Sequence, residues 1–313
     1  MPLINLFALA FSTTQLLHVG LLTQAAPVNQ VTTAQPAATT PAEGYSTAED
    51  LLDALEKADA NLRTLTSEIQ YDKIDGVTGD RQIRWGKVFF VDDSGSATQQ
   101  RDRKFAVRFD KLQLGDRLEE EEQLFVFNGE WLTEISPNHK QIIRRQVMPP
   151  GSDFDPLKVG EGPLPLPIGQ KKDDMLARFK VTLLSDVAEL SGEDDAETAK
   201  LKEFVKGSYQ LKLIANPGTS EAEKFTQIRL WYRVWELKDG EKRLLPRMAK
   251  TVTPKSGNET IVRMIKVQTN TPVDPKMMAA DVAGDDWDIR VEALPMRDDN
   301  SGPSVKPAAP AGK

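Results

Sequence analysis

The first strongly patterned stretch of the chain has apolar residues at helical spacing. Ser46 and Glu49 frame the sequence STAE, which has the form of a capping box, where a hydroxyl and a carboxylate satisfy free N–H groups at a helix start. The residues behind it place one apolar stripe opposite a charged face, and the stripe consists of Leu51, Leu52, Leu55, Ala58, Leu62 and Leu65. A single amphipathic helix of this kind needs an apolar surface to lie on.

From residue 66 onward the period of the pattern changes to two, which is typical of strands. In KFAVRFD (residues 104–110) aromatic and aliphatic residues alternate with smaller or charged ones. Asn128-Gly129 lies between two apolar runs and predicts a two-residue hairpin. After a short helix at residues 171–179, strand-like runs resume at 181–186, 208–215, 226–237, 243–252 and 259–269. The pattern predicts sequential antiparallel strands.

A proline-rich stretch, GEGPLPLPIGQ (residues 160–170), interrupts this run of strands. Prolines at alternate positions remove the N–H donors that a sheet needs, so Leu164, Leu166 and Ile168 cannot belong to a sheet interior. Three exposed apolar side chains would form a sticky patch, so they must pack on something else. They either close the end of a core as a loop or form a flap at the mouth of an apolar cavity. A ligand for proline-recognition domains is a third reading.

The ends of the chain differ from its middle in composition. Residues 1–42 carry no charged side chain and 3–22 are mainly apolar, so we expect residues 1–25 to be a secretory signal cleaved near Ala25, with an uncleaved membrane anchor as the alternative. Residues 26–44 and 298–313 have few bulky side chains, which predicts a disordered tether and a disordered tail. Residues 45–297 are then expected to fold as one domain.

Composition removes several classes of function. A net charge of −7 argues against a nucleic-acid partner, and the absence of cysteine excludes disulfides, thiolate metal sites and a cysteine nucleophile. The two histidines, His18 and His139, lie in the leader and in a turn, so neither a metal site nor a catalytic histidine is expected. Glycines show no phosphate-binding pattern. We therefore expect no catalytic residues, no metal and no cofactor.

The predicted strands contain many large aromatic and aliphatic side chains. One reading is a sheet face packed on its helices, and the other is the lining of an apolar cavity that binds an acyl ligand. The candidate lining residues are Trp85, Phe89, Phe105, Val107, Phe109, Phe125, Phe127, Leu230 and Tyr232.

The order of these elements resembles the LolA-type lipoprotein carriers of the bacterial envelope, over residues 48–280. The motifs that carry the resemblance are FVFNGEWL (125–132), FTQIRLW (225–231), LPRM (245–248) and VQTNTPVDPKMM (267–278). It implies an α+β fold of mostly antiparallel strands, a curved incomplete β-barrel with helices over its concave face. It also implies that Arg108 helps to hold a lid shut, although an outward-facing strand charge is the alternative reading.

The resemblance implies a periplasmic, monomeric carrier that is not an enzyme. Its partners would be an acylated lipoprotein or another lipid, an inner-membrane donor complex and an outer-membrane acceptor. An acyl chain of about 15 methylenes costs roughly 12 kcal/mol to expose to water, so such a carrier must replace the membrane almost completely. An envelope sensor of the RseB type on the same scaffold is the alternative, and an enzyme or a structural envelope protein are weaker ones.

Overall fold

The structure is a computed structural model, and it describes only part of the chain. The described residues are 44–59, 61–93, 103–148, 159, 168, 170–237, 240–281, 284 and 286–294. The expected leader, nearly all of the expected tether, the expected tail, and Leu164 and Leu166 of the proline-rich stretch lie outside them. Within the described residues, no helix combines the length and the apolar character needed to cross a bilayer.

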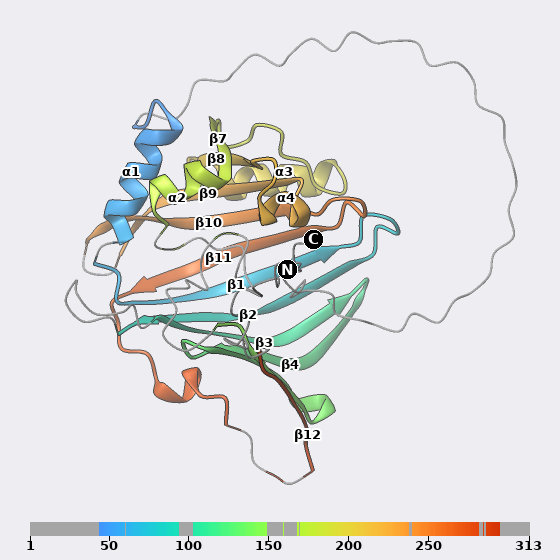
Figure 1. Cartoon of the computed structure of the whole chain (residues 1–313). Coiled ribbons are helices and arrows are strands. Elements are labelled where there is room, and N and C mark those ends of the chain that lie inside the picture. Colours follow the sequence, from blue (N-terminus) through green and yellow to red (C-terminus); the bar gives the residue numbers. More distant parts are fainter. Residues whose placement is uncertain are drawn as a thin grey trace, which may run out of the picture.

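One twelve-stranded sheet dominates the molecule, in the order β12-β6-β5-β4-β3-β2-β1-β11-β10-β9-β8-β7 (Figure 1). Neighbouring strands are antiparallel except for β12 and β6, which are parallel. The strands are β1 (Thr64–Ile74), β2 (Arg81–Asp92), β3 (Arg103–Leu114), β4 (Arg117–Phe127), β5 (Trp131–Ser136), β6 (Gln141–Gln146), β7 (Phe179–Leu184), β8 (Tyr209–Ala215), β9 (Gln227–Glu236), β10 (Lys242–Val252), β11 (Glu259–Thr269) and β12 (Asp288–Glu292). Because β12 and β7 are free edges, the curved sheet is not closed, which confirms the predicted α+β incomplete barrel.

The sheet is accompanied by α1 (Ala48–Asp59), α2 (Lys172–Arg178), α3 (Asp195–Val205), α4 (Ser220–Lys224) and the 3-10 turns η1 (Pro137–His139) and η2 (Pro275–Met278). The capping box of α1 lies one residue later than predicted. The backbone N–H of Asp50 donates to Thr47 Oγ1 at 3.0 Å, and the Thr47 N–H donates to Asp50 Oδ2 at 3.1 Å. Asp50 therefore has the role that the pattern gave to Glu49.

The hairpin at Asn128-Gly129 also differs slightly from the prediction. β4 ends at Phe127 and β5 begins at Trp131, so residues 128–130 connect the two strands, one residue more than expected. Asn128 Oδ1 accepts a hydrogen bond from the Trp131 N–H at 3.1 Å, and Gly129 has a φ of 102° that favours glycine. The signal was right about the turn but not about its length.

Alternation along the strands separates two faces. On β9, Leu230 and Tyr232 belong to the large cluster that also holds the leucines of α1 and Met175 of α2, and we call this side the inner face. Trp231, between them, packs with Leu201 and Val205 of α3 on the outer face. Helices α1 and α2 thus cover the inner face, while α3 covers part of the outer face, a feature that the sequence pattern did not indicate.

Candidate functional site: the apolar inner face

A continuous apolar row crosses the inner face from β1 to β5. The strand register aligns Leu65 with Phe90, Phe90 with Phe105, Phe105 with Phe127, and Phe127 with Leu132. The rings of Phe105 and Phe127 are stacked, with centroids 5.5 Å apart and planes 18° apart. The antiparallel pairing alone brings these side chains together, because the register decides which residues face each other.

A second row lies beside the first. Val107 pairs with Phe125 across β3 and β4. The ring of Phe109 meets Phe125 edge-on at 6.4 Å and lies 5.8 Å from the ring of Tyr71. The edge-to-face contact of Phe109 with Phe125 is one of the arrangements that aromatic pairs prefer.

The inner face continues on the other half of the sheet. Leu230 and Tyr232 of β9 lie in the same cluster as Val262 and Met264 of β11. Burial raises the pKa of the Tyr232 hydroxyl well above its ordinary value, and the negative charge of Asp59 adds to this effect. Tyr232 therefore stays neutral and adds no charge to this part of the inner face.

The cover of this face consists of separate segments. Leu51, Leu52 and Leu55 of α1 are at most 5% exposed, and Met175 of α2 is fully buried. Val159, just before the proline-rich stretch, and Ile168, within it, join the same cluster, and Ile168 is 2% exposed. We call α1, α2, Val159 and Ile168 the cover.

Polar contacts link the parts of the cover to one another. Lys172 of α2 donates from Nζ to Asp53 of α1 at 2.9 Å and from its backbone N–H to Glu56 at 3.2 Å. The hydrogen bond to Asp53 raises the pKa of Lys172, and the nearby carboxylates of α1 and α2 add to the shift. Arg178 donates to the carbonyl oxygen of Val159 at 2.8 Å. Helix α1 meets the inner face through its leucines and meets α2 through charges.

Three of the predicted site residues do not lie on the inner face. Phe89 belongs to an outer-face cluster with Ala106 and Val126. Trp85 pairs with Gln70, whose neighbours along β1, Ile69 and Tyr71, point inward, so the indole faces outward. The prediction failed for both because several adjacent strand residues are apolar, and alternation alone could not tell the two faces apart.

Arg108 also lies on the outer face. Its guanidinium donates to the carbonyl oxygens of Lys276, Met277 and Ala279 at 2.9–3.0 Å. It therefore holds η2 and the residue after it against the sheet and does not contact the helices of the inner face. Arg108 therefore points outward, as the alternative reading expected. Its partner, the backbone of residues 276–279, could not be seen from strand periodicity.

Sequence reasoning missed a polar group at one end of the inner face. Glu134 is 9% exposed and accepts from Gln123 Nε2 at 3.0 Å and from Arg145 Nη1 at 3.3 Å. A signal was present, because alternation in WLTEIS places Glu134 on the same face as Leu132. In the part of the chain that is described, no group of three His, Cys, Asp or Glu side chains could hold a metal ion. The arrangement is suited to holding an apolar body next to a small polar end.

No protein-family model matches the chain, and no curated protein matches it significantly. Solved structures do. An outer-membrane lipoprotein-sorting protein domain from Vibrio parahaemolyticus has 11% identity over 74% of this chain and 95% of its own, with a TM-score of 0.35. A LolA superfamily protein from Nitrosomonas europaea has 10% identity over 75% and 98%, with a TM-score of 0.34. The MucA/MucB complex of Pseudomonas aeruginosa has 13% identity over 74% and 60%, with a TM-score of 0.30.

These structures include the superfamily that the sequence resembles.

Proposed function

We propose that the inner face binds acyl chains and that the protein is a non-enzymatic carrier of acylated lipoproteins or other lipids. The observation that supports this most is the division between a continuous apolar face on an open sheet and a cover made of separate helices and loop residues. The ligand lining would be Phe105, Val107, Phe109, Phe125, Phe127, Leu230 and Tyr232.

The free energies of burial would allow an acyl chain to replace α1 on the inner face. Burial of the three leucines of α1 stabilises the covered state by about 5–9 kcal/mol, at about 1.5–3 kcal/mol for each side chain. An acyl chain of about 15 methylenes gains roughly 12 kcal/mol on leaving water. A single acyl chain can therefore offset the cost of moving α1 away, and no covalent step is needed.

In this proposal the protein works in the periplasm as a monomer. It would receive its cargo from an inner-membrane donor and deliver it to an outer-membrane acceptor. Ile168 would lie at the rim of the inner face. The polar end at Glu134 and Arg145 would lie beside the head of the cargo.

The test is native mass spectrometry with lipid extraction of the full chain purified from a bacterial envelope fraction, followed by titration with dodecanoic acid and with an N-acylated peptide. We expect acylated species to co-purify and both probes to bind. A protein that is empty and also refuses both probes would contradict the proposal. If the protein bound neither probe but bound the periplasmic segment of a membrane protein, an envelope sensor of the RseB type would be the better interpretation.

Phe105 and Phe89 provide a matched pair of variants. They lie on adjacent strands, both are at most 8% exposed, and they face opposite sides of the sheet. Both Phe105→Leu and Phe89→Leu should cost about 1 kcal/mol of stability through loss of packing. Only Phe105→Leu should alter the affinity for dodecanoic acid, whereas equal effects of the two changes would place the ligand elsewhere.

A further inference from the structure

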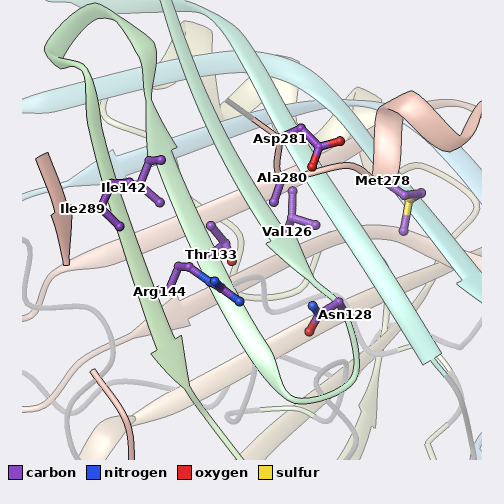
Figure 2. Close-up of a pocket in the computed structure, with 9 residues that line it drawn as sticks. All are labelled: Val126, Asn128, Thr133, Ile142, Arg144, Met278, Ala280, Asp281 and Ile289. Atoms are coloured by element: carbon purple, nitrogen blue, oxygen red, sulfur yellow. The ribbon is translucent and has the colours of Figure 1, made fainter. Parts of the chain in front are cut away.

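A cavity lies on the outer face, apart from the apolar rows described above. Its volume is about 470 Å³, which is within the range of small-molecule sites. Figure 2 shows side chains from β4, the loop after it, β5 and β6, and from η2, the segment after η2 and β12 around the cavity. The lining residues are Val126, Asn128, Thr133, Ile142, Arg144, Met278, Ala280, Asp281 and Ile289.

Two fixed segments build the walls. Arg108 holds three backbone carbonyls of residues 276–279, and Met278 and Ala280 pack against Phe89 and Val126 of the sheet. On the other side β12 pairs with β6, and Val291 lies opposite Arg144 in that register. The cavity is therefore bounded by strands and by an anchored turn.

The polar groups in the cavity are mainly donors. Arg144 is exposed, and within the described ranges it has no carboxylate in ion-pair distance. Its guanidinium carbon lies 5.3 Å from the centre of the Trp131 ring, which supports the planar group from one side. A guanidinium held in this way offers parallel N–H groups that match a carboxylate or a phosphate.

Two further donors lie near Arg144. The Oδ1 atom of Asn128 accepts from the Trp131 N–H, so the Nδ2 group of that amide remains as a donor. Thr133 is 4% exposed and lines the cavity, and its hydroxyl has no protein hydrogen-bond partner in the part of the chain that the structure describes. Figure 2 shows Arg144 extending toward Asn128, with Asp281 on the opposite side of the cavity.

The remainder of the lining is apolar. Val126 and Ile142 are at most 4% exposed and form the sheet side, while Ile289 on β12 is 56% exposed. We infer that this outer-face cavity binds a small amphiphilic anion, with a carboxylate or phosphate on Arg144, Asn128 and Thr133 and a short apolar body against Val126, Ile142 and Met278. The inferred ligand differs from the inner-face cargo in size and in its need for a negative charge.

Methyl-labelled full-length protein tests the site by NMR titration. The probes are octanoate and octyl phosphate as the two anion sources, with octanol and octylamine as neutral and cationic controls. Binding should shift the methyl resonances of Met278, Ile142 and Ile289. Ile69 and Met264 report on the inner face in the same spectra, so failure of the acyl-carrier proposal and failure of this inference are distinguishable.

The decisive variant is Arg144→Met, which keeps the length of the side chain and removes its charge. We expect the affinity for octanoate or octyl phosphate to fall about tenfold or more, since hydrogen bonds to charged groups are lost, and the affinity for octanol to stay the same. Whichever anion binds more tightly identifies the head group. Arg290→Met, on exposed β12, is the matched control and should change neither affinity.

Three results would overturn the inference. These are shifts confined to Ile69 and Met264, equal or tighter binding of octylamine, and an unchanged affinity for both anions in Arg144→Met. If Arg144→Met fails to fold, Arg144→Lys serves instead, because it keeps the charge and loses the planar fork. Ala280→Phe should fill the cavity and abolish the shifts of Met278, Ile142 and Ile289 with every probe, and full shifts of these three methyl groups in that variant would also contradict the site.

Discussion

Asp72 shows what a single buried charge does in this sheet. It is fully buried on β1, where Arg81 and Arg263 contact the same carboxylate oxygen, Arg263 at 2.9 Å, and Gln70 donates to the other oxygen at 2.9 Å. Glu197 of α3 contacts both arginines from above. The network joins β1, β2 and β11 to α3 on the outer face.

Replacement of Asp72 by asparagine should be strongly destabilising. It leaves two guanidinium groups without their shared carboxylate, and breaking a buried pair in this way costs about 3–5 kcal/mol. Urea denaturation followed by circular dichroism measures the loss. Asp116→Asn, at an exposed turn, is the control and should stay within about 0.5 kcal/mol of the parent. A loss of similar size in both variants would contradict the role given to the network.

Glu197 makes the same network sensitive to pH. Burial opposes ionisation of its carboxyl, but the hydrogen bond and charge of Arg81 and the charge of Arg263 hold its pKa below the ordinary value of 4.5. Since the pKa is lower in the folded state, the stabilisation by this group is complete above about pH 4.5 and is lost as the pH falls through the folded-state pKa.

The measurement compares unfolding free energies of the parent and Glu197→Gln between about pH 7 and pH 3. The difference between them should be largest at neutral pH and should shrink below about pH 4.5. A difference that grows as the pH falls would mean that the carboxylate opposes folding.

At the scale of elements, Lys172 joins the two helices of the cover. Lys172 lies among Asp53, Glu49 and the Glu56 carboxylate that accepts from its backbone N–H. Lys172→Glu places a fourth negative charge there, so α1 should separate from α2 more often. We expect faster amide exchange in α1 and faster uptake of dodecanoic acid. Lys206→Glu, on the exposed end of α3, is the control, and equal uptake rates in both variants would refute this mechanism.

The element held by Arg108 provides a second prediction. Arg108→Lys removes the planar fork that contacts three carbonyl groups, and we expect a loss of about 1–3 kcal/mol with faster amide exchange confined to residues 276–280. Lys87→Gln, at the exposed position next to Arg108 on β2, should have little effect. If exchange in α1 increased instead, Arg108 would act on the inner-face cover after all.

At the scale of the whole molecule, the proposed binding of an acyl chain on the open sheet would change the position of α1. Dodecanoic acid at about 100 times its dissociation constant should raise the free energy of unfolding by about 2.7 kcal/mol. In the same sample, amide exchange in α1 should become faster, because the ligand takes the place of its leucines. Hydrogen exchange read by mass spectrometry checks both effects. Protection of α1 on binding would show that the ligand enters without displacing the cover.

Periodicity was sufficient to predict an amphipathic helix followed by antiparallel strands, whereas the incomplete barrel was implied by the family resemblance. The helical stripe of α1, the alternation in β3 and the turn at Asn128 are local patterns, since a strand repeats every two residues and a helix every 3.6. It also separated Val107 and Phe109 from Arg108, because the charged residue lies between them. Periodicity did not assign a residue to the correct face where adjacent strand residues are both apolar, as at Phe89 and Phe90.

The sequence by itself indicated α1, α2, most of the strands in their order, and the supply of apolar side chains for one large face, but not α3, α4 or β12. The tertiary structure alone decided which residues share that face, how α1 and α2 cover it, and that α3 and η2 lie on the other side. Arg144, Thr133 and Met278 come from three separate segments, so no local pattern could join them in one cavity. The physical reason is that periodicity fixes the direction of a side chain within its own element, whereas its partners depend on register and on contacts between residues far apart in the chain.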